Sequence, residues 1–421
     1  MAFIQYDTNG ISQPPRASAY LCRFCLPNSS QAAQLSEVQA PALPLVAGAG
    51  IQIPPNSARI LSSWGLLDAI RAYSIEPEGL ILRDYRDGAV LSDSKLVPGM
   101  KEAYGAPWLL IHRADFYRVL AEEAERLGVK IRLGCAVTQI NCSCAPILVS
   151  TSAVLDVQVD VVLGADGLHS KCRGMIQESS EPQLMTKDSV HRIMITGNAI
   201  RAHSELEDLL KSPVTNTWMG PGAHVAGYPL KGSSTYNFVF ICDILLNRLG
   251  DMRNHFKDWD PRLRLVLEVA HDIQQWPVTV SLGKERWVHA VGNFSLLGDA
   301  CHAMFPYLAQ GAAQAVEDGA VLGALFGNIR QKTDIRDILL MYEKIRRPRT
   351  TRVMELSIEN GQIFHMLECG ERNEKHEQHE IARLSGSSLD TWADPGFRDW
   401  LFGYDVVKEA EEIARRLRSS A

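Results

Sequence analysis

The chain has 421 residues, of which 46% are hydrophobic, and a formal net charge of −6 at pH 7; this length suits two or three domains with a large core. Its charges are interspersed and leave no basic footprint, so we expect no binding to nucleic acid or to an acidic membrane. No apolar run approaches the ~18 residues of a membrane span, and the N-terminus lacks a signal pattern, which predicts a cytoplasmic protein.

The nine cysteines are an odd number in a chain without a secretion signal, which indicates reduced thiols rather than a disulfide framework. Cys22 and Cys25 form a lone C-x-x-C pair, and Cys142 and Cys144 form a C-x-C pair. A zinc site needs four ligands at matching spacings, and no histidine-rich segment supplies the others. We therefore expect no metal.

Residues 1–36 look unlike the rest of the chain, because prolines and polar clusters interrupt them and no strand-length apolar run precedes a helical pattern. The stretch LPLVAGAGIQIPPN follows, in which Gly48 and Gly50 look like the start of a phosphate-binding G-x-G-x-x-G loop. The third glycine position holds Ile53, and Pro54 and Pro55 remove backbone donors where a helix would begin. The sequence predicts a loop here.

Helical spacing of apolar residues starts within 57–70. Residues 114–128 are the clearest predicted helix, with Asp115 as the N-cap and Gly128 as the C-terminal stop. Strands are predicted at 129–133 and 156–167, and the second ends in a turn.

Residues 188–286 alternate in hydrophobicity and predict an antiparallel sheet with a helix over 261–276. A strand and turn return at 288–300, and helices follow. This order predicts an α/β protein with a β-rich insertion. The expected division is an atypical segment 1–36, an α/β domain in two parts (37–187 and 287–360), the insertion 188–286 and a helical region 361–421.

The segment from Leu296 to Phe326 is the most informative one. Asp299 follows an apolar strand, at the end where α/β sheets place ligand-binding residues, and its carboxylate can accept hydrogen bonds from sugar hydroxyls. Gly311 and Ala312 begin a helix, and they allow a flat ligand to approach its positive end. In the same segment we interpret His302 as a packing or loop-capping residue, and Glu317 and Asp318 as surface charges.

Within this segment, the spacing G-D-A-x-H-x-x-x-P-x-x-x-Q-G resembles that of the FAD-dependent aromatic monooxygenases similar to salicylate hydroxylase. GADGLHSKCR at 164–173 and GAGIQIPPNSARIL at 48–61 match two further signatures of that family, and the likeness extends over about 37–359. The resemblance implies an FAD-binding Rossmann-like domain with an inserted substrate domain. It also implies FAD as cofactor, NAD(P)H and O₂ as co-substrates, and a small aromatic substrate, in a setting such as secondary metabolism.

The resemblance also implies individual roles. Glu37 would hold the adenosine ribose, Gly50 would line the FAD, and Arg113 would contact it; Asp299, Gly311 and Ala312 would complete the cofactor site. On the substrate side, Arg201 and Tyr228 match two polar residues that face the ring, where an arginine stabilises a phenolate and a tyrosine donates to it. Without the family, Arg201 reads as a solvated strand residue and Tyr228 as a packing residue. Trp218 suits a pocket wall and a core position equally.

One family element is missing from the sequence as written. Family members begin with a strand, a G-x-G-x-x-G turn and a helix, whereas TNGISQ has one glycine where three are needed. Either the start of the chain differs from the natural one, which we favour, or FAD binding has decayed. We expect weak FAD binding or none. The alternative to a monooxygenase is thus a non-catalytic or FAD-deficient remnant of the same fold; a halogenase lacks support because no W-x-W-x-I-P stretch is present.

Overall fold

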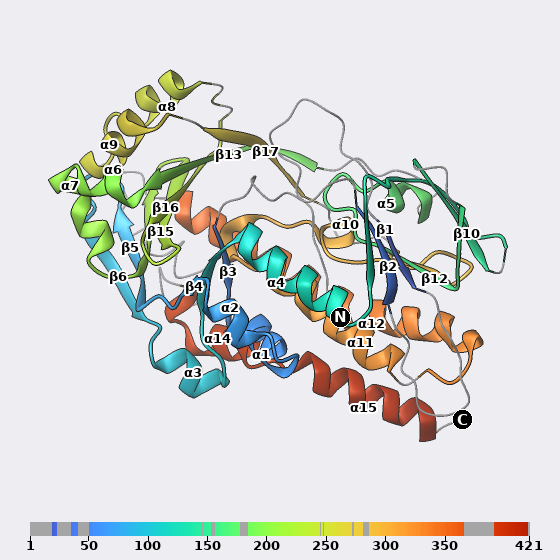
Figure 1. Ribbon diagram of the computed structural model, residues 1–421. Coiled ribbons are helices and arrows are strands. Elements are labelled where there is room, and N and C mark those ends of the chain that lie inside the picture. Colours follow the sequence, from blue (N-terminus) through green and yellow to red (C-terminus); the bar gives the residue numbers. More distant parts are fainter. Residues whose placement is uncertain are drawn as a thin grey trace.

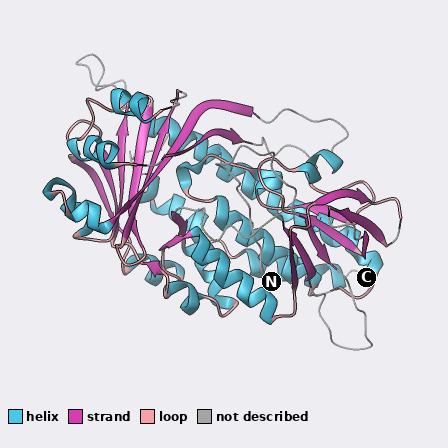
Figure 2. Ribbon diagram, turned by 45° about the horizontal axis from the view of Figure 1, so that its top comes forward, coloured by secondary structure: helices cyan, strands magenta, loops and turns pink. Residues whose placement is uncertain are grey.

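The structure is a computed structural model, and it describes residues 19–22, 35–40, 50–144, 146–152, 156–176, 184–244, 246, 248–271, 273–280, 286–327, 329–365 and 391–419. Of 19–22 and 35–40 it describes only the backbone. TNGISQ, Gly48 and Cys25 therefore lie outside the described residues. Figure 2 shows a large sheet at one end of the molecule, smaller sheets at the other end, and helices between them.

A five-stranded sheet forms the core of the first domain, and strand β12 within it is a buried run of Val-Val-Leu-Gly. In sheet order its strands are β18 (Phe294–Leu296), β12 (Val161–Gly164), β1 (Ala19–Cys22), β2 (Leu35–Ala40) and β8 (Lys130–Leu133). β12 runs parallel to β18 and β2 runs parallel to β8, whereas β1 is antiparallel to both of its neighbours. Residues 1–36 lack a strand-length apolar run before a helical pattern, but their described parts contain β1 and the start of β2, in which Glu37 pairs with Lys130.

The segment predicted as a loop is a strand followed by a helix. β3 (Gly50–Ile53) pairs with β7 (Leu109–His112), which also pairs with β4 (Ser74–Ile75). Helix α1 (Pro55–Ser63) begins directly after β3, with Pro54 as its N-cap. The loop prediction failed because the first helical N–H has no intrahelical acceptor, so a proline at that position costs nothing and presets φ.

Three more helices belong to this region. They are α2 (Leu67–Arg71), α3 (Gly99–Tyr104) and α4 (Arg113–Arg126). Two of them, α2 and α4, contact strands of the small sheet. Helix α4 is confirmed, and Gly128 beyond its end has φ +88°. Its N-cap is His112, whose side chain accepts from the Ala114 N–H, so the assignment of the cap to Asp115 was wrong. Asp115 lies in the first turn, where a carboxylate favours the helix dipole.

The large sheet has seven strands. In order they are β17 (Gln274–Val280), β13 (Leu184–Thr196), β16 (Thr235–Cys242), β15 (Ala223–Leu230), β14 (Val214–Gly220), β5 (Gly79–Asp84) and β6 (Val90–Lys95). β5 pairs with β14 in parallel, so residues 79–95 extend the sheet of the β-rich insertion. The predicted helix 261–276 is shorter than expected, because α9 ends at Val269 and Gln274 already belongs to β17.

One face of the large sheet is covered by apolar residues of short helices, including Leu206, Leu209, Met252 and Leu263. These helices lie at one end of the molecule in Figure 1. They are α6 (Gly197–Arg201), α7 (Ser204–Glu207), the 3-10 helix η1 (Asp208–Leu210), α8 (Leu249–His255) and α9 (Pro261–Val269). The opposite face of the sheet faces the rest of the molecule.

A fourth sheet and a short helix complete the region around 137–176. The sheet contains β9 (Val137–Asn141), β10 (Ile147–Thr151) and β11 (Asp156–Val159), and the helix is α5 (Lys171–Ile176). The single strand predicted at 156–167 is thus two strands that belong to different sheets, because β11 ends at Val159 and β12 begins at Val161.

The C-terminal part is helical, as predicted. Its elements are α10 (Asp299–His302), η2 (Pro306–Leu308), α11 (Gly311–Phe326), η3 (Lys332–Asp334), α12 (Ile335–His365), η4 (Thr391–Ala393), α14 (Pro395–Phe402) and α15 (Val406–Ser419). Helix α11 is almost entirely buried and packs against α1, α12 and α15. Within the described ranges, no helix combines the length and the apolar character needed to cross a membrane.

Candidate active site

A cavity of about 330 Å³ lies between the large sheet and the helical part of the molecule. Six of the residues expected at the site line it: Gly50, Arg113, Tyr228, Asp299, Gly311 and Ala312. They come from β3, the start of α4, β15, α10 and the start of α11. Segments far apart in the sequence therefore meet here as expected.

The large sheet forms one wall of the cavity. Side chains at alternate strand positions share a face, and the strand registers align them into rows. One row contains Thr217, Ala226, Val239 and Arg192, and the next contains His224, Ile241 and Val190. All of these line the cavity. The wall is thus mainly apolar, with a few polar groups at fixed positions.

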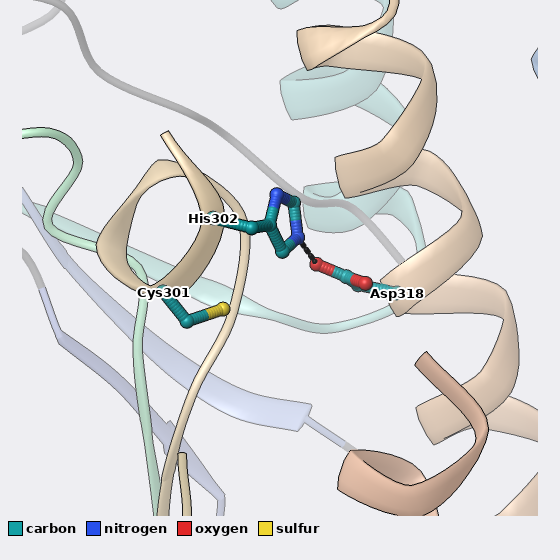
Figure 3. A group of neighbouring side chains, drawn as sticks. All are labelled: Cys301, His302 and Asp318. Atoms are coloured by element: carbon teal, nitrogen blue, oxygen red, sulfur yellow. Dashed lines mark hydrogen bonds and ion pairs between the residues drawn. The ribbon is translucent and has the colours of Figure 1, made fainter. Parts of the chain in front are cut away.

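The opposite wall is built on the turn after β18. Gly298 has φ +61°, a conformation that disfavours other residues. Its N–H donates to Asp318 Oδ2 at 2.8 Å, and the His302 ring contacts the same oxygen through Nε2 at 2.6 Å. Figure 3 shows His302 on α10 turned toward Asp318 on α11. These contacts fix the turn that presents Asp299 to the cavity, and they fit the interpretation of His302 as a packing residue.

Beneath this turn lies a buried charge network. Arg346 on α12 donates to Asp318 at 2.8 Å and to Glu317, and Arg349 donates to Glu317 at 2.8 Å. Burial alone would raise the pKa of Glu317, but Arg349 and Arg346 lower it to about 2. Our interpretation of Glu317 and Asp318 as surface charges was wrong, since both are at most 1% exposed. The network holds α11 against α12.

Cys301, His302 and Asp318 place their potential metal-ligating atoms within 4.8 Å of one another. Both Asp318 oxygens already accept hydrogen bonds, from Gly298, His302 and Arg346. Burial raises the pKa of the Cys301 thiol well above its usual range, and a protonated thiol is a poor ligand. We therefore interpret the cluster as a scaffold for the turn.

The start of α11 suits the ring end of an FAD molecule. The first N–H groups of a helix have no acceptor within it, and they favour negative charge in front of them. A Cβ atom built on Gly311 would meet nothing within 4 Å, so the backbone there is open to a flat ligand. Asp299 stands beside it with a carboxylate. The residues present fit the flavin end of the cofactor.

The pyrophosphate end is different. A dinucleotide-binding βαβ unit requires two parallel strands, whereas β1 and β2 are antiparallel. Glu37 lies in β2, but its side chain is outside the described part of the chain. In the described part of the chain, the residues therefore fit the flavin end of FAD but not its pyrophosphate end.

Arg201 does not occupy the predicted position. It ends helix α6, is exposed, and bonds to Asn198; it is not among the described residues that line the cavity. The strand that was expected to carry it stops at Thr196, where the threonine side chain caps α6. Trp218 belongs to the core. It is fully buried, and its indole N–H donates a hydrogen bond to Asp260 Oδ2 at 2.7 Å.

Sequence reasoning missed Arg192, His224 and Thr217. Arg192 lies on β13, nine positions before Arg201, with its guanidinium 4.7 Å from the Trp276 ring centre. His224 precedes Tyr228 by four residues on the same strand, which puts both on one face. The alternation in AHVAGYPL could have predicted that His224 lies on the same face as Tyr228.

Gly50 lies so close to Tyr228 that a larger residue does not fit. A Cβ on Gly50 would lie 2.4 Å from a ring carbon and 2.8 Å from the hydroxyl of Tyr228. We expect Gly50→Ala to displace the tyrosine and lower the free energy of unfolding by about 1–3 kcal/mol, as overpacking does. Thermal melting would measure this. Gly99→Ala is the control, because a Cβ there meets nothing within 4 Å; equal melting temperatures for the two variants would contradict the prediction.

The comparisons with known proteins agree with this site. The FAD binding domain family matches residues 42–357. The FAD-dependent monooxygenase OpS4 of Beauveria bassiana (strain ARSEF 2860) is 35% identical over 382 residues, which cover 86% of this chain and 88% of that protein. The 3-amino-4-hydroxybenzoate 2-monooxygenase of Streptomyces cremeus is 29% identical over 378 residues, which cover 88% of this chain and 89% of that protein.

Solved structures show the same fold. A salicylate hydroxylase substrate complex superposes with a TM-score of 0.71 at 21% identity, covering 87% of this chain and 90% of that one. FqzB gives a TM-score of 0.75 at 21% identity, over 91% of this chain and 89% of its own. The chain belongs to the FAD binding domain family and, within it, to the FAD-dependent monooxygenases, which are oxidoreductases.

Proposed function

We propose that the protein hydroxylates a small aromatic or phenolic molecule, using FAD as cofactor and NAD(P)H and O₂ as co-substrates. One observation carries the proposal: a single cavity is lined by Asp299 and the α11 N-terminus on one side and by Tyr228 and Arg192 on the other. The first pair suits a flavin, and the second suits a phenol. No disulfide joins any of Cys135, Cys142, Cys144, Cys172, Cys242 and Cys301, which supports a reducing compartment such as the cytoplasm.

On the cofactor side, Asp299 would accept hydrogen bonds from ribityl hydroxyls, and the N–H groups of Gly311 and Ala312 would stabilise negative charge on the ring. Arg113, at the start of α4, lines the same cavity and would contact the cofactor. When bound, reduced FAD supplies the electrons that activate O₂. The chain's own groups orient the two ligands and exclude water.

On the substrate side, Arg192 and Tyr228 would orient the ring and favour its phenolate. Burial raises the pKa of Tyr228 to about 12, so its hydroxyl remains a hydrogen-bond donor near neutral pH. The Arg192 guanidinium brings a positive charge to the same wall. Charge that develops on a phenol oxygen is stabilised by donors of this kind. Arg192 thereby takes the role that we had expected for Arg201.

We expect Tyr228→Phe and Arg192→Ala each to slow hydroxylation by about 10²-fold, the scale for losing one stabilising donor, while FAD reduction by NAD(P)H stays normal. Single-turnover kinetics with a phenolic substrate would separate the two steps. Arg201→Ala is the matched control, because Arg201 is exposed on α6. If Arg201→Ala hydroxylates slowly while Arg192→Ala hydroxylates at the wild-type rate, Arg201 rather than Arg192 stabilises the phenolate.

An FAD-deficient remnant of the fold is the second candidate. The antiparallel pairing of β1 with β2 favours it, because this pair lacks the parallel geometry of a dinucleotide-binding unit. The colour of the purified protein discriminates between the two: a monooxygenase that retains FAD is yellow. A colourless protein that takes up no added FAD would support the remnant.

A further inference from the structure

The cavity is wider along the large sheet than one aromatic ring. Arg192 on β13 and Thr217 on β14 share a row, and both line the cavity. The strands β16 and β15 lie between them, and neighbouring strands are about 4.8 Å apart, so this row spans roughly 14 Å. Leu80, on the next strand β5, also lines the cavity. A phenol held at Arg192 and Tyr228 therefore leaves the β14–β5 side of the cavity for another part of the substrate.

Apolar side chains line this side of the cavity. Leu80, Phe364 and Trp392 belong to one buried cluster, and Met304 packs against it. All four line the cavity, and we call them its apolar end. Phe364 also packs against the His224 ring at a centroid distance of 5.0 Å, so the apolar end adjoins the wall that the large sheet forms.

Trp392 is held as a rigid wall within the apolar end. It is 4% exposed, and its ring packs against those of Trp108 and Phe402 at centroid distances of 5.3 and 6.1 Å. The indole N–H of Trp108 donates to Gln52 Oε1 at 3.0 Å, so this neighbouring ring is fixed as well. An indole supported in this way presents a flat apolar surface to a molecule in the cavity.

The segment that carries this tryptophan is anchored on both sides by polar contacts. Thr391 donates to Asn360 Oδ1 at 2.8 Å, and Asn360 donates to the carbonyl of Tyr307, a cavity residue, at 3.0 Å. On the other side, Arg349 and Arg59 donate to the carbonyls of the last two residues of α14, at 2.8 and 2.9 Å. Such carbonyls have no donor within their own helix. The C-terminal helical part is thus built into the cavity.

We propose that the apolar end receives a second ring or a flat apolar arm of the substrate, and that Trp392 determines which arm fits. The substrate class is then a phenol extended by such a group, rather than a single ring. The proposal rests on the proposed function, because the phenol itself would be held at Arg192 and Tyr228. A flat arm packs on the indole ring against ring, which is favourable beyond the burial of its area.

The test measures the binding of phenol, 3-phenylphenol and 4-phenylphenol to full-length protein with FAD present, by isothermal titration calorimetry. The wild type should bind one of the phenylphenols at least about tenfold more tightly than phenol, because the second ring is buried. Trp392→Leu should weaken binding of that phenylphenol by about three- to tenfold, the scale of one aromatic contact, and leave phenol binding unchanged.

Trp400→Leu is the matched control. This tryptophan lies on α14 of the same segment, is 38% exposed, and is not among the described residues that line the cavity. It should bind all three compounds as the wild type does. Equal weakening of phenylphenol binding in the two variants would overturn the role of Trp392.

The outcomes separate the proposal from the proposed function. If the wild type binds phenol as tightly as both phenylphenols, or if a folded Trp392→Leu keeps the wild-type preference, the apolar end is no subsite and the proposed function stands. If the wild type binds none of the three compounds, both fall together. If Trp392→Leu does not fold, hydrogen exchange of the wild type decides. The tighter phenylphenol should slow exchange of the backbone N–H groups in 391–402 more than phenol does, and equal exchange overturns the proposal.

Discussion

Replacement of Asp299 by alanine is expected to leave the protein without bound FAD. Its carboxylate lines the cavity from the first residue of α10, just after β18, where it would accept two hydrogen bonds from the cofactor. Hydrogen bonds to a charged group contribute ~1.5–3 kcal/mol each. Losing two should weaken FAD binding by about 10²- to 10⁴-fold, since each 1.4 kcal/mol is about tenfold.

Fluorescence titration of FAD into the purified variant measures this effect. Asp258→Ala, at an exposed position before α9, should bind FAD as the wild type does. A variant at Asp299 that copurifies with a full complement of flavin would remove this residue from the cofactor site. The wild-type titration in the same experiment tests the expectation that the chain as written binds FAD weakly.

The second large effect is expected at Arg346. This side chain is fully buried and bonds to Glu317 and Asp318, and it also donates to Gln314 Oε1 at 2.7 Å. Removing one partner of a buried ion pair leaves uncompensated charge and costs about 3–5 kcal/mol. Arg346→Met should lower the free energy of unfolding by that amount, as measured by urea denaturation.

The neighbouring residue provides a matched control. Arg347 bonds to Glu343 one turn earlier on the same helix, but 44% of its side chain is exposed, so Arg347→Met should cost only about 0.3–0.5 kcal/mol. Equal losses of unfolding free energy in the two variants would mean that the buried network stabilises the fold no more than an exposed ion pair does. Because Asp318 also holds Gly298, any Arg346→Met that folds should bind FAD less tightly than the wild type.

The grouping of Asp299 and Gly311 in one cavity wall could be predicted from the sequence because these residues are close together in the chain. Gly298, Asp299 and Gly311 lie within one strand–turn–helix unit, whose spacing is set by local geometry. The buried network could not be predicted in this way. Glu317 and Asp318 look like surface charges until α12 brings Arg346 and Arg349 against them.

On the substrate side, the sequence did not show which arginine reaches the cavity. Arg192 and Arg201 lie in one apolar-rich stretch, and only the end of β13 at Thr196 decides which of them reaches the cavity. Likewise, the sequence alone did not indicate that β5 pairs with β14, which lies much later in the chain. Long-range pairing determined both outcomes, and a single sequence carries little signal for it.

The pairing of β5 with β14 also constrains the order of events during synthesis. β5 and β6 leave the ribosome long before β14 exists, and until then β5 presents an edge of unpaired N–H and C=O groups. Parallel pairing across so long a loop is slow. This edge of β5 can therefore pair with other chains until residue 220 has emerged, and a gene fragment cut at 188–286 would yield a sheet in which the β14 edge is unpaired and prone to aggregate.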